Sequence, residues 1–296
     1  MFEKVNPQHP DKVADRIAGA IVDLAYAKSE NPKVAVEVLL GHKQCKVFIE
    51  SSEHFEWEEI KPIVDRIGGE MHLYLHAVEQ DVHLAKNQDG KVRCGDNGIF
   101  KGSAPTHEQK LLTSLAQCIY DHLPYDGKYI VNTVHGTATE NVYFTFCQSH
   151  MDEETEKIFT LQYLDPICEA HRKYRKKYYG DITNYHYLFN PLGPWTGGTD
   201  VDCGATNRKL GSDMGDGVTG GGLHGKDLSK ADVSVNIWCY LESIRTGHQV
   251  TACCSIGDET VNGIPYADIV EQARLYIHTL GGFEKFAEWG LIRAKE

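Results

Sequence analysis

The chain has 296 residues, a mass of 33.2 kDa, a formal net charge of −12 and a sequence pI near 5.7. This length can bury a large core, in one elaborate domain or in two to three smaller ones. The acidic balance argues against a nucleic-acid-binding protein, which needs a basic face to release counterions, but a local basic pocket for a small anionic ligand is compatible with it.

The nine cysteines include no Cys-x-x-Cys pair, a pattern typical of reduced thiols in the cytoplasm. The amino terminus has no apolar signal core, and no window approaches the apolar length of a membrane span. We therefore expect a soluble cytoplasmic protein without membrane contact.

The first predicted unit covers residues 1–79. It opens with an amphipathic helix over residues 9–30, because Pro10 suits a first turn and apolar residues then recur at helical spacing. Strands near 34–40 and 45–51, a helix near 56–69 and a strand near 71–78 follow. The free N–H groups at the start of the first helix favour a bound anion beside His9 and Asp11, although an ordinary charged first turn has the same sequence. The strand residues Glu37 and Glu50 either need buried partners or face water.

The second predicted unit covers residues 95–195. The polar segment 79–96 before it is either a lid or only a connection. The unit has a helix near 107–123, strands near 129–134 and 141–148, a long helix over 152–178 and a strand near 185–191. The third unit, 196–296, has helices near 227–247 and 265–282 around a strand near 249–257. We therefore predict an α+β fold of three similar α/β units in a pseudo-threefold arrangement, each a sheet covered by helices.

A glycine-rich segment over residues 196–232 contains ten of the 28 glycines together with spaced cations and aspartates. Glycines let backbone N–H groups approach phosphate oxygens, so we interpret the segment as a polyphosphate cradle; a mobile surface loop is the alternative. The cations that would neutralise phosphate are Arg208, Lys209, Lys226 and Lys230. The carboxylates that would hold Mg²⁺ or substrate are Asp202, Asp213 and Asp232.

The stretch GGGLHGK, from Gly220 to Lys226, fits the spacing of a P-loop. However, Asp227 replaces the Ser or Thr that would bind Mg²⁺, and no apolar strand leads into it. We keep the phosphate-binding interpretation and reject the P-loop fold.

Five segments in chain order resemble the S-adenosylmethionine synthetase (methionine adenosyltransferase) family. HPDKVADRIAGAIVDLAY is similar to its GHPDK-helix signature, with Gln8 in place of glycine. The others are DNGIFKG, DGKYIVN, DCGATNRK and GGGLHGKDLSKAD. The resemblance covers nearly the whole chain. The chain is shorter than the family, with a lid reduced to DVHLAKNQDGKVRC and an end at WGLIRAKE that lacks the closing segment.

The resemblance implies roles for individual residues. Catalytic roles would belong to His9, Lys128, Arg208, Lys226 and Lys230. ATP would contact Glu3, His9, Asp126, Lys128, Trp195, Asp202, Arg208, Lys209, Lys226 and Ile256. Methionine would contact Glu50, Gln80, Asp96, Asp202 and Lys230. Two Mg²⁺ ions would involve Asp11 and Asp232, and K⁺ would be held by Glu37.

The implied reaction is attack of the methionine sulfur on ribose C5′ of ATP, followed by hydrolysis of triphosphate to pyrophosphate and phosphate. The resemblance also implies a homodimer with shared active sites. Asn97 departs from the family's Gln, but the charged positions survive, so a working enzyme is favoured over a relic. The alternatives are an ATP or triphosphate hydrolase and a non-catalytic nucleotide-binding subunit that regulates a full-length synthetase.

Overall fold

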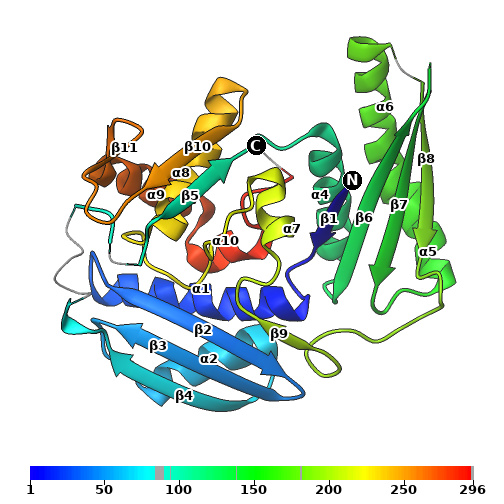
Figure 1. The fold of residues 1–296 in the computed structure, drawn as a ribbon. Coiled ribbons are helices and arrows are strands. Elements are labelled where there is room, and N and C mark those ends of the chain that lie inside the picture. Colours follow the sequence, from blue (N-terminus) through cyan, green and yellow to red (C-terminus); the bar gives the residue numbers. More distant parts are fainter. Residues whose placement is uncertain (84–89, 94, 138, 181, 295–296) are drawn as a thin grey trace.

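The fold is α+β, with helices packed on separate β-sheets (Figure 1). The computed structural model describes residues 1–83, 90–93, 95–137, 139–180 and 182–294. None of the helices in these ranges is long and apolar enough to cross a membrane. The eight cysteines in these ranges are free thiols.

The first sheet has the strand order β4-β3-β2-β9. Its strands are β2 (Val34–Gly41), β3 (Gln44–Ser51), β4 (His72–Glu79) and the short β9 (Cys203–Ala205), and α1 (Pro10–Lys28) and α2 (Trp57–Gly68) pack against them. Apolar and polar residues alternate along β3, so Cys45, Val47 and Ile49 are buried while Lys46, Phe48 and Glu50 point outward. One face of the sheet therefore lies on the core.

The second sheet has the order β1-β6-β7-β8. Its strands are β1 (Phe2–Val5), β6 (Gly127–His135), β7 (Thr139–Gln148) and β8 (Ile182–Phe189). The helices of this part are α4 (His107–His122), α5 (Glu153–Phe159) and α6 (Asp165–Tyr179). The predicted helix over 152–178 is not uniform, since a π-helical turn, Thr160–Leu164, separates α5 from α6. Pro166 follows this turn and has no N–H to donate to the preceding turn, which accounts for the break.

The third sheet pairs β5 (Gly98–Gly102) with β10 (Val250–Cys254), and α8 (Ala231–Thr246) packs on both strands while α9 (Tyr266–Leu280) packs on α8. A small hairpin joins β11 (Thr260–Val261) to β12 (Ile264–Pro265). The remaining helices are α7 (Leu210–Met214), a 3₁₀ turn at Gly215–Gly217 and α10 (Phe283–Trp289).

Helix α1 lies in the middle of the molecule, between the first sheet and α10 (Figure 1). It packs closely because two glycines remove side chains at its contacts. A Cβ on Gly19 would lie 2.6 Å from the carbonyl oxygen of Phe283 in α10, and one on Gly204 of β9 would lie 2.1 Å from the Pro10 carbonyl. The amino end of α1 is thereby fixed against β9.

The structure confirms the α+β class and the main predicted helices and strands. The pseudo-threefold arrangement and the units 1–79, 95–195 and 196–296 stay predictions. The sheets take strands from across those boundaries, because β1 pairs with β6, β9 with β2, and β5 with β10. Strands β1, β5 and β9 are too short to show a period-2 pattern, so sequence periodicity missed them.

Candidate active site

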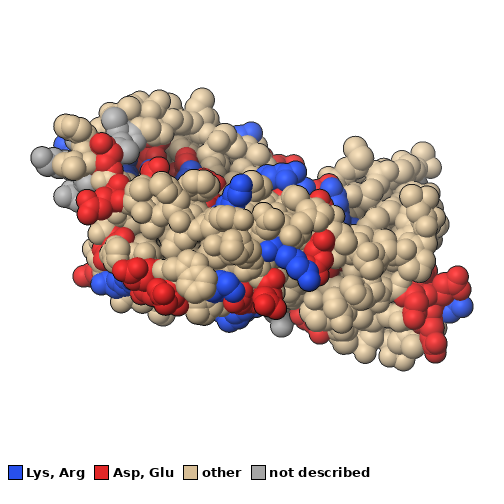
Figure 2. Space-filling view, turned by 90° about the horizontal axis from the view of Figure 1, so that it is seen from below, with Lys and Arg blue, Asp and Glu red and all other residues tan. Residues whose placement is uncertain are grey.

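A pocket of 690 Å³ opens where the start of α1, strands β6 and β7, and the segment 190–209 meet. Figure 2 shows basic side chains beside acidic ones where the larger part of the molecule meets the smaller part that carries β6, β7 and β8. Eight residues predicted for the ATP or metal site line this pocket: His9, Asp11, Asp126, Lys128, Trp195, Asp202, Arg208 and Lys209. The fold therefore brings together residues from three distant parts of the chain.

Two carboxylates of α1 fix the segment after β9. The N–H of Ala205 donates to Asp11 Oδ1 (2.9 Å), and the N–H of Asn207 donates to Asp15 Oδ1 (2.8 Å). The two carboxylates lie four residues apart on α1, one helical turn, so both face the segment after β9. This docking leads the chain directly to Arg208 and Lys209 at the pocket.

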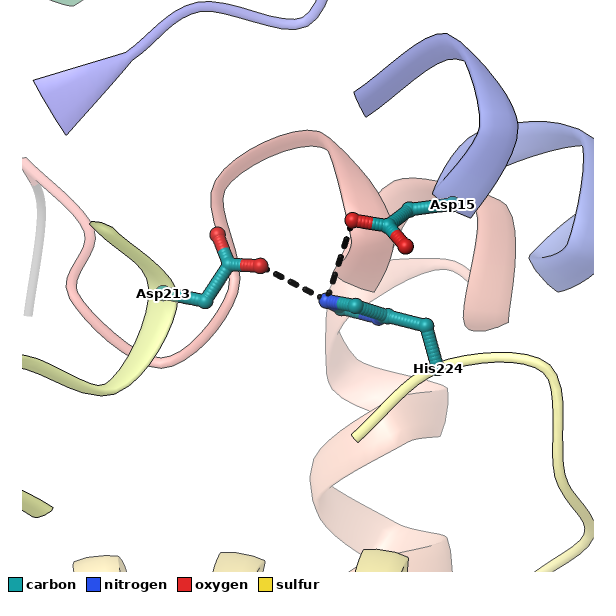
Figure 3. A group of neighbouring side chains, drawn as sticks. All are labelled: Asp15, Asp213 and His224. Carbon is teal, nitrogen blue, oxygen red and sulfur yellow. Dashed lines mark hydrogen bonds and ion pairs between the residues drawn. The ribbon is translucent and has the colours of Figure 1, made fainter. Parts of the chain in front are cut away.

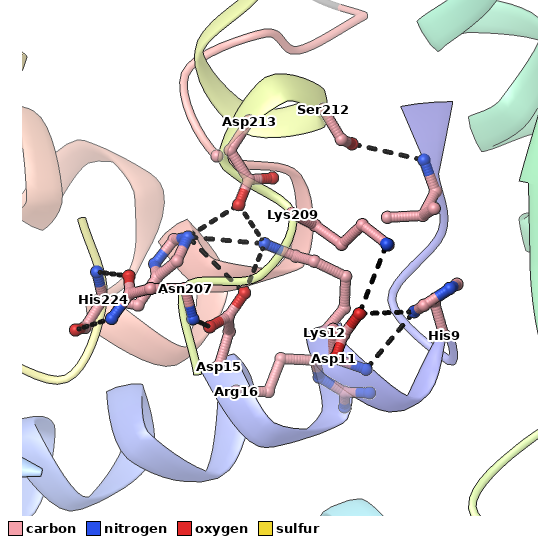
Figure 4. Close-up of polar contacts among 12 residues, drawn as sticks. His9, Asp11, Lys12, Asp15, Arg16, Asn207, Lys209, Ser212, Asp213 and His224 are labelled. Carbon is pink, nitrogen blue, oxygen red and sulfur yellow. Dashed lines mark hydrogen bonds and ion pairs between the residues drawn. The ribbon is translucent and has the colours of Figure 1, made fainter. Parts of the chain in front are cut away.

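Asp11 is the charge centre of the pocket (Figure 4). Its side chain is only 2% exposed, yet Arg208 Nη1 lies 3.4 Å from Oδ1 and Lys209 Nζ lies 3.4 Å from Oδ2. A nearly buried carboxylate held between cations and a backbone N–H is a hard oxygen ligand that is already placed to receive positive charge.

His9 caps the amino end of α1, and its Nδ1 accepts the N–H of Asp11 (3.3 Å). Burial lowers the pKa of His9 to about 4, with the nearby charges of Lys209 and Lys128 acting in the same direction and Asp11 opposing them. The ring is therefore neutral at pH 7, and its 3.7 Å approach to the Asp11 carboxylate is not a salt bridge. Because Nδ1 is an acceptor, the proton lies on Nε2, where it is free to be donated.

Trp195 also lines the pocket, and the glycines that follow it pack against its indole and against Asp126. Trp195 Nε1 donates to Asn190 Oδ1 (3.1 Å), and Gly198 N–H donates to Asp126 Oδ2 (2.8 Å). A Cβ on Gly197 would lie 2.4 Å from the indole and 2.5 Å from the Asp126 carboxylate, so only glycine allows both approaches. Burial raises the pKa of Asp126 to about 6, although the Gly198 N–H opposes this.

Lys128 and Glu3 form an ion pair of 3.1 Å across strands β6 and β1, and both side chains are more than 40% exposed. Seven further pocket residues were not predicted from the sequence: Cys147, Cys203, and Asn190 with the turn 191–194 that follows it. Cys147 lies opposite Lys128 in the β6–β7 register, and Cys203 is in β9, so their position depends on strand pairing. Asn190 has φ of 33°, and its place before a Pro-Gly-rich turn is the signal that could have identified it.

The other predicted site residues do not line this pocket, and several contact one another instead. Lys226 Nζ lies 2.5 Å from Asp232 Oδ2, and the N–H of Ala231 donates to Asp96 Oδ2 (3.2 Å). Lys230 is the residue before α8, and burial raises the pKa of Asp96 although Lys230 lowers it. Lys226 forms an isolated β-bridge with Ala35 of β2, so these residues lie beside the first sheet.

Four further predicted residues lie on or after strands. Glu37 of β2 accepts a hydrogen bond from Thr206 Oγ1, and Glu50 points outward from β3. Gln80 follows β4 with only 9% exposure and a partnerless Oε1, and Ile256 is 54% exposed after β10. Together with Lys226, Lys230, Asp96 and Asp232, we call these residues the second group.

A buried charge network lies below the pocket, made of Lys12, Asp15, Asp213 and His224 (Figures 3 and 4). Asp15, Asp213 and His224 have the spacing of a metal site, but Lys12 Nζ lies 2.5 Å from Asp213 Oδ2 and 3.1 Å from Asp15 Oδ2. The ammonium group therefore already neutralises the cluster. The expectation that Asp213 contacts phosphate or Mg²⁺ is not met at the pocket, because this side chain is fully buried and paired with Lys12 and His224 (2.8 Å).

The carboxyl-terminal part of the glycine-rich segment is packed, which argues against the alternative of a mobile surface loop for residues 223–228. Leu223 and Leu228 are 1% and 2% exposed, and a Cβ on Gly225 would lie 2.3 Å from the Val36 carbonyl oxygen. Residues 210–217 before GGGLHGK form α7 and a 3₁₀ turn rather than a strand, which confirms that this stretch is no P-loop. Of the shortened lid at residues 81–94, residues 84–89 and 94 lie outside the described residues.

The pocket and the second group both offer oxygen ligands that fit Mg²⁺. Asp11 and Asp232 each hold a carboxylate oxygen against an ammonium group, and carboxylate oxygens are the ligands this ion prefers. Glu37 offers an oxygen for a monovalent cation, with Thr206 as its neighbour.

Comparison with known proteins gives one consistent family. The model of the S-adenosylmethionine synthetase N-terminal domain matches residues 1–89. The S-adenosylmethionine synthase of Acholeplasma laidlawii is 28% identical over 321 residues, which cover 94% of this chain and 81% of that protein. The S-adenosylmethionine synthase of Helicobacter pylori strain 26695 is 28% identical over 315 residues, 94% of this chain and 80% of its own length. The similarity is distant, but it extends over nearly the whole chain.

Proposed function

We propose that this chain, which the comparisons identify as a divergent member of the S-adenosylmethionine synthetase family, forms S-adenosylmethionine from ATP and L-methionine. The observation that carries this proposal is the pocket itself, in which a neutral His9 lies beside Asp11, Lys128, Arg208 and Lys209. These groups suit a reaction in which a neutral sulfur displaces a polyphosphate and negative charge builds on the leaving oxygen.

In this proposal, the thioether sulfur of methionine attacks C5′ of the ribose, the C5′–O bond breaks, and triphosphate leaves. The sulfur is neutral and needs no base, so positioning and the exclusion of water carry much of the rate. His9 donates its Nε2 proton in a hydrogen bond to the leaving oxygen, while Lys128, Arg208 and Lys209 hold the phosphates. Trp195 supplies a flat wall for adenine. Mg²⁺ held by Asp11 and Asp232 supplies charge neutralisation on the phosphates when bound.

We infer that a second copy of this chain completes the site. The second group contains all the residues that the resemblance assigns to methionine except Asp202, together with those assigned to K⁺ and part of the triphosphate, yet it does not line the pocket of its own chain. The outer faces of the first two sheets also expose apolar side chains, with Leu39 and Phe48 at 50% and 53% and Ile130 and Leu188 at 45% and 51%. A dimer that covers these faces would bring the second group of one copy to the pocket of the other.

The function is tested by mass spectrometry of purified protein supplied with ATP, methionine, Mg²⁺ and K⁺. We expect S-adenosylmethionine, pyrophosphate and phosphate in equal amounts. Phosphate without S-adenosylmethionine would favour the hydrolase instead, and bound ATP without any product would favour the non-catalytic subunit.

Sharing of the site is tested by mixing two inactive variants, Lys209→Met in the pocket and Lys226→Ala in the second group. A mixed dimer has one site with both substitutions and one site with neither, so mixing should restore activity that neither variant shows alone. Mixtures that stay inactive after subunit exchange would place all the groups of one site in a single chain.

A further inference from the structure

Three predicted phosphate-binding positions share one property in the free chain: their cations are paired with carboxylates. Arg208 and Lys209 lie 3.4 Å from Asp11, Lys226 lies 2.5 Å from Asp232, and Lys128 lies 3.1 Å from Glu3. A triphosphate that enters without a metal must compete with these carboxylates for four of the five predicted phosphate-binding cations, the fifth being Lys230. The pairs therefore oppose binding of the free anion.

The three carboxylates differ in what else they can bind. Asp11 and Asp232 are the two positions whose oxygen ligands fit Mg²⁺, whereas Glu3 has a 41% exposed side chain on the edge strand β1 and no such assignment. A divalent cation on Asp11 or Asp232 would replace the ammonium or guanidinium group there. The released cation would then be free for phosphate.

We propose that the site works as a charge exchange, in which Mg²⁺ takes the carboxylates of Asp11 and Asp232 and thereby releases Arg208, Lys209 and Lys226 to the triphosphate. The metal and the triphosphate then bind with positive coupling, and the site discriminates against a metal-free polyphosphate. This inference rests on the proposed function, because it assumes that the pocket and the second group bind triphosphate. It concerns binding, so it can be tested without turnover.

Burial predicts how strongly each pair opposes the free anion. The Asp11 side chain is 2% exposed, and its partners Lys209 and Arg208 are 18% and 57% exposed. The Lys226–Asp232 pair is about one fifth exposed on both sides, and the Lys128–Glu3 pair is 44% and 41% exposed. Ion pairs weaken as water screens them, so the effect should fall in this order.

The experiment is calorimetric titration of the full-length chain with inorganic tripolyphosphate, once with EDTA and once with excess Mg²⁺, at equal ionic strength. The variants are Asp11→Asn, Asp232→Asn and the matched control Glu3→Gln. Asparagine keeps an oxygen that can accept the Ala205 N–H, so docking of β9 on α1 is retained.

The expected result is a reversal of sign. Without metal, Asp11→Asn and Asp232→Asn should tighten tripolyphosphate binding about fivefold, because their cations are released. With Mg²⁺, the same two variants should bind about tenfold more weakly, which is an ordinary size for the coupling between two ligands. Glu3→Gln should tighten binding by about twofold or less in both buffers.

Two other results would decide against the exchange. If Asp11→Asn and Asp232→Asn leave metal-free binding unchanged or weaken it, the charge exchange is wrong, while the phosphate site stands. If the unmodified chain binds neither tripolyphosphate nor ATP in either buffer, the proposed function fails and this inference fails with it.

Discussion

The first two turns of α1 serve two regions that use the same residue types in opposite ways. On one side lies the buried charge network of Lys12, Asp15, Asp213 and His224, where all four side chains are at most 3% exposed. On the other side lies the pocket, where Asp11 is buried but its partner Arg208 is 57% exposed. Both regions also draw on the part of the glycine-rich segment that follows β9.

The two regions differ in how far their charged side chains are neutralised by partners within the fold. In the network, an ammonium group, two carboxylates and an imidazole lie within hydrogen-bond or ion-pair distance, and Asn207 holds the His224 backbone through its Oδ1 (2.8 Å) and Nδ2 (3.1 Å). In the pocket, cations and carboxylates face an open space of 690 Å³. The comparison teaches that burial, more than residue type, decides whether a charge stabilises the fold or waits for a ligand.

The largest effect should follow Lys12→Met, which removes the ammonium group that contacts both Asp15 and Asp213. Burial alone would lower the pKa of Lys12, but the charges of Asp213 and Asp15 outweigh it and raise this pKa. Two buried carboxylates would lose their counter-charge, at a cost of about 3–5 kcal/mol in the free energy of unfolding. Urea denaturation followed by circular dichroism measures this loss.

A double variant sharpens the same test. Lys12→Met combined with Asp213→Asn should recover part of the lost stability, because one uncompensated charge is removed with its partner. If Lys12→Met lowered the free energy of unfolding by less than about 1 kcal/mol, the network would not be a stabilising unit.

Lys209→Met should have the opposite pattern, with a large loss of turnover and little loss of stability. Lys209 faces the pocket and pairs with Asp11, so its removal takes away a cation that would stabilise the leaving triphosphate. We expect turnover to fall about 10²–10³-fold, the usual size for loss of one charge-stabilising group. Steady-state kinetics and thermal unfolding measure the two effects.

The matched control is Lys173→Met on α6, a lysine with a 76% exposed side chain that does not line the pocket. Its turnover should equal that of the unmodified chain. If the Lys209→Met protein had near-normal turnover, this would contradict the proposed role in catalysis of the pocket at the start of α1.

The pocket was more predictable from sequence than the network beside it. Pro10 and the apolar spacing predicted α1, and the cations at 208, 209 and 226 stood out among glycines. The pairing of Lys12 with Asp213 joins residues 201 positions apart, and nothing local distinguishes Asp213 from Asp202 or Asp232. Composition shows that charges are present, but it does not show which of them become buried.

The same limit applies to the strands that position the site. Strand β9 has three residues and β1 has four, so neither shows a periodic pattern, yet β9 delivers Arg208 and β1 carries Glu3 to Lys128. Long-range pairing alone fixes them. The second group could be assigned by resemblance, but its separation from the pocket became visible only in three dimensions.

The smallest effect concerns Asp126, a pocket carboxylate whose negative charge is not fully neutralised by its neighbours in the fold. Its buried Oδ1 has no hydrogen-bond partner among the residues that the structure describes, and burial raises its pKa from 3.8 to about 6. Between these two values the unfolded chain has lost the proton while the folded chain still holds it. Ionisation of Asp126 therefore lowers the free energy of unfolding as the pH rises from about 4 to 6.

Asp126→Asn removes this titration and keeps an acceptor for the Gly198 N–H. Relative to the unmodified chain, the variant should gain about 2 kcal/mol in the free energy of unfolding between pH 4 and pH 7. Urea denaturation at several pH values measures the difference, and Asp121→Asn at the exposed end of α4 should show no such trend. If the difference in the free energy of unfolding between Asp126→Asn and the unmodified chain did not change with pH, the Asp126 charge would be neutralised as fully as the charges of the network. The contrast between the two sides of α1 would then not hold at this residue.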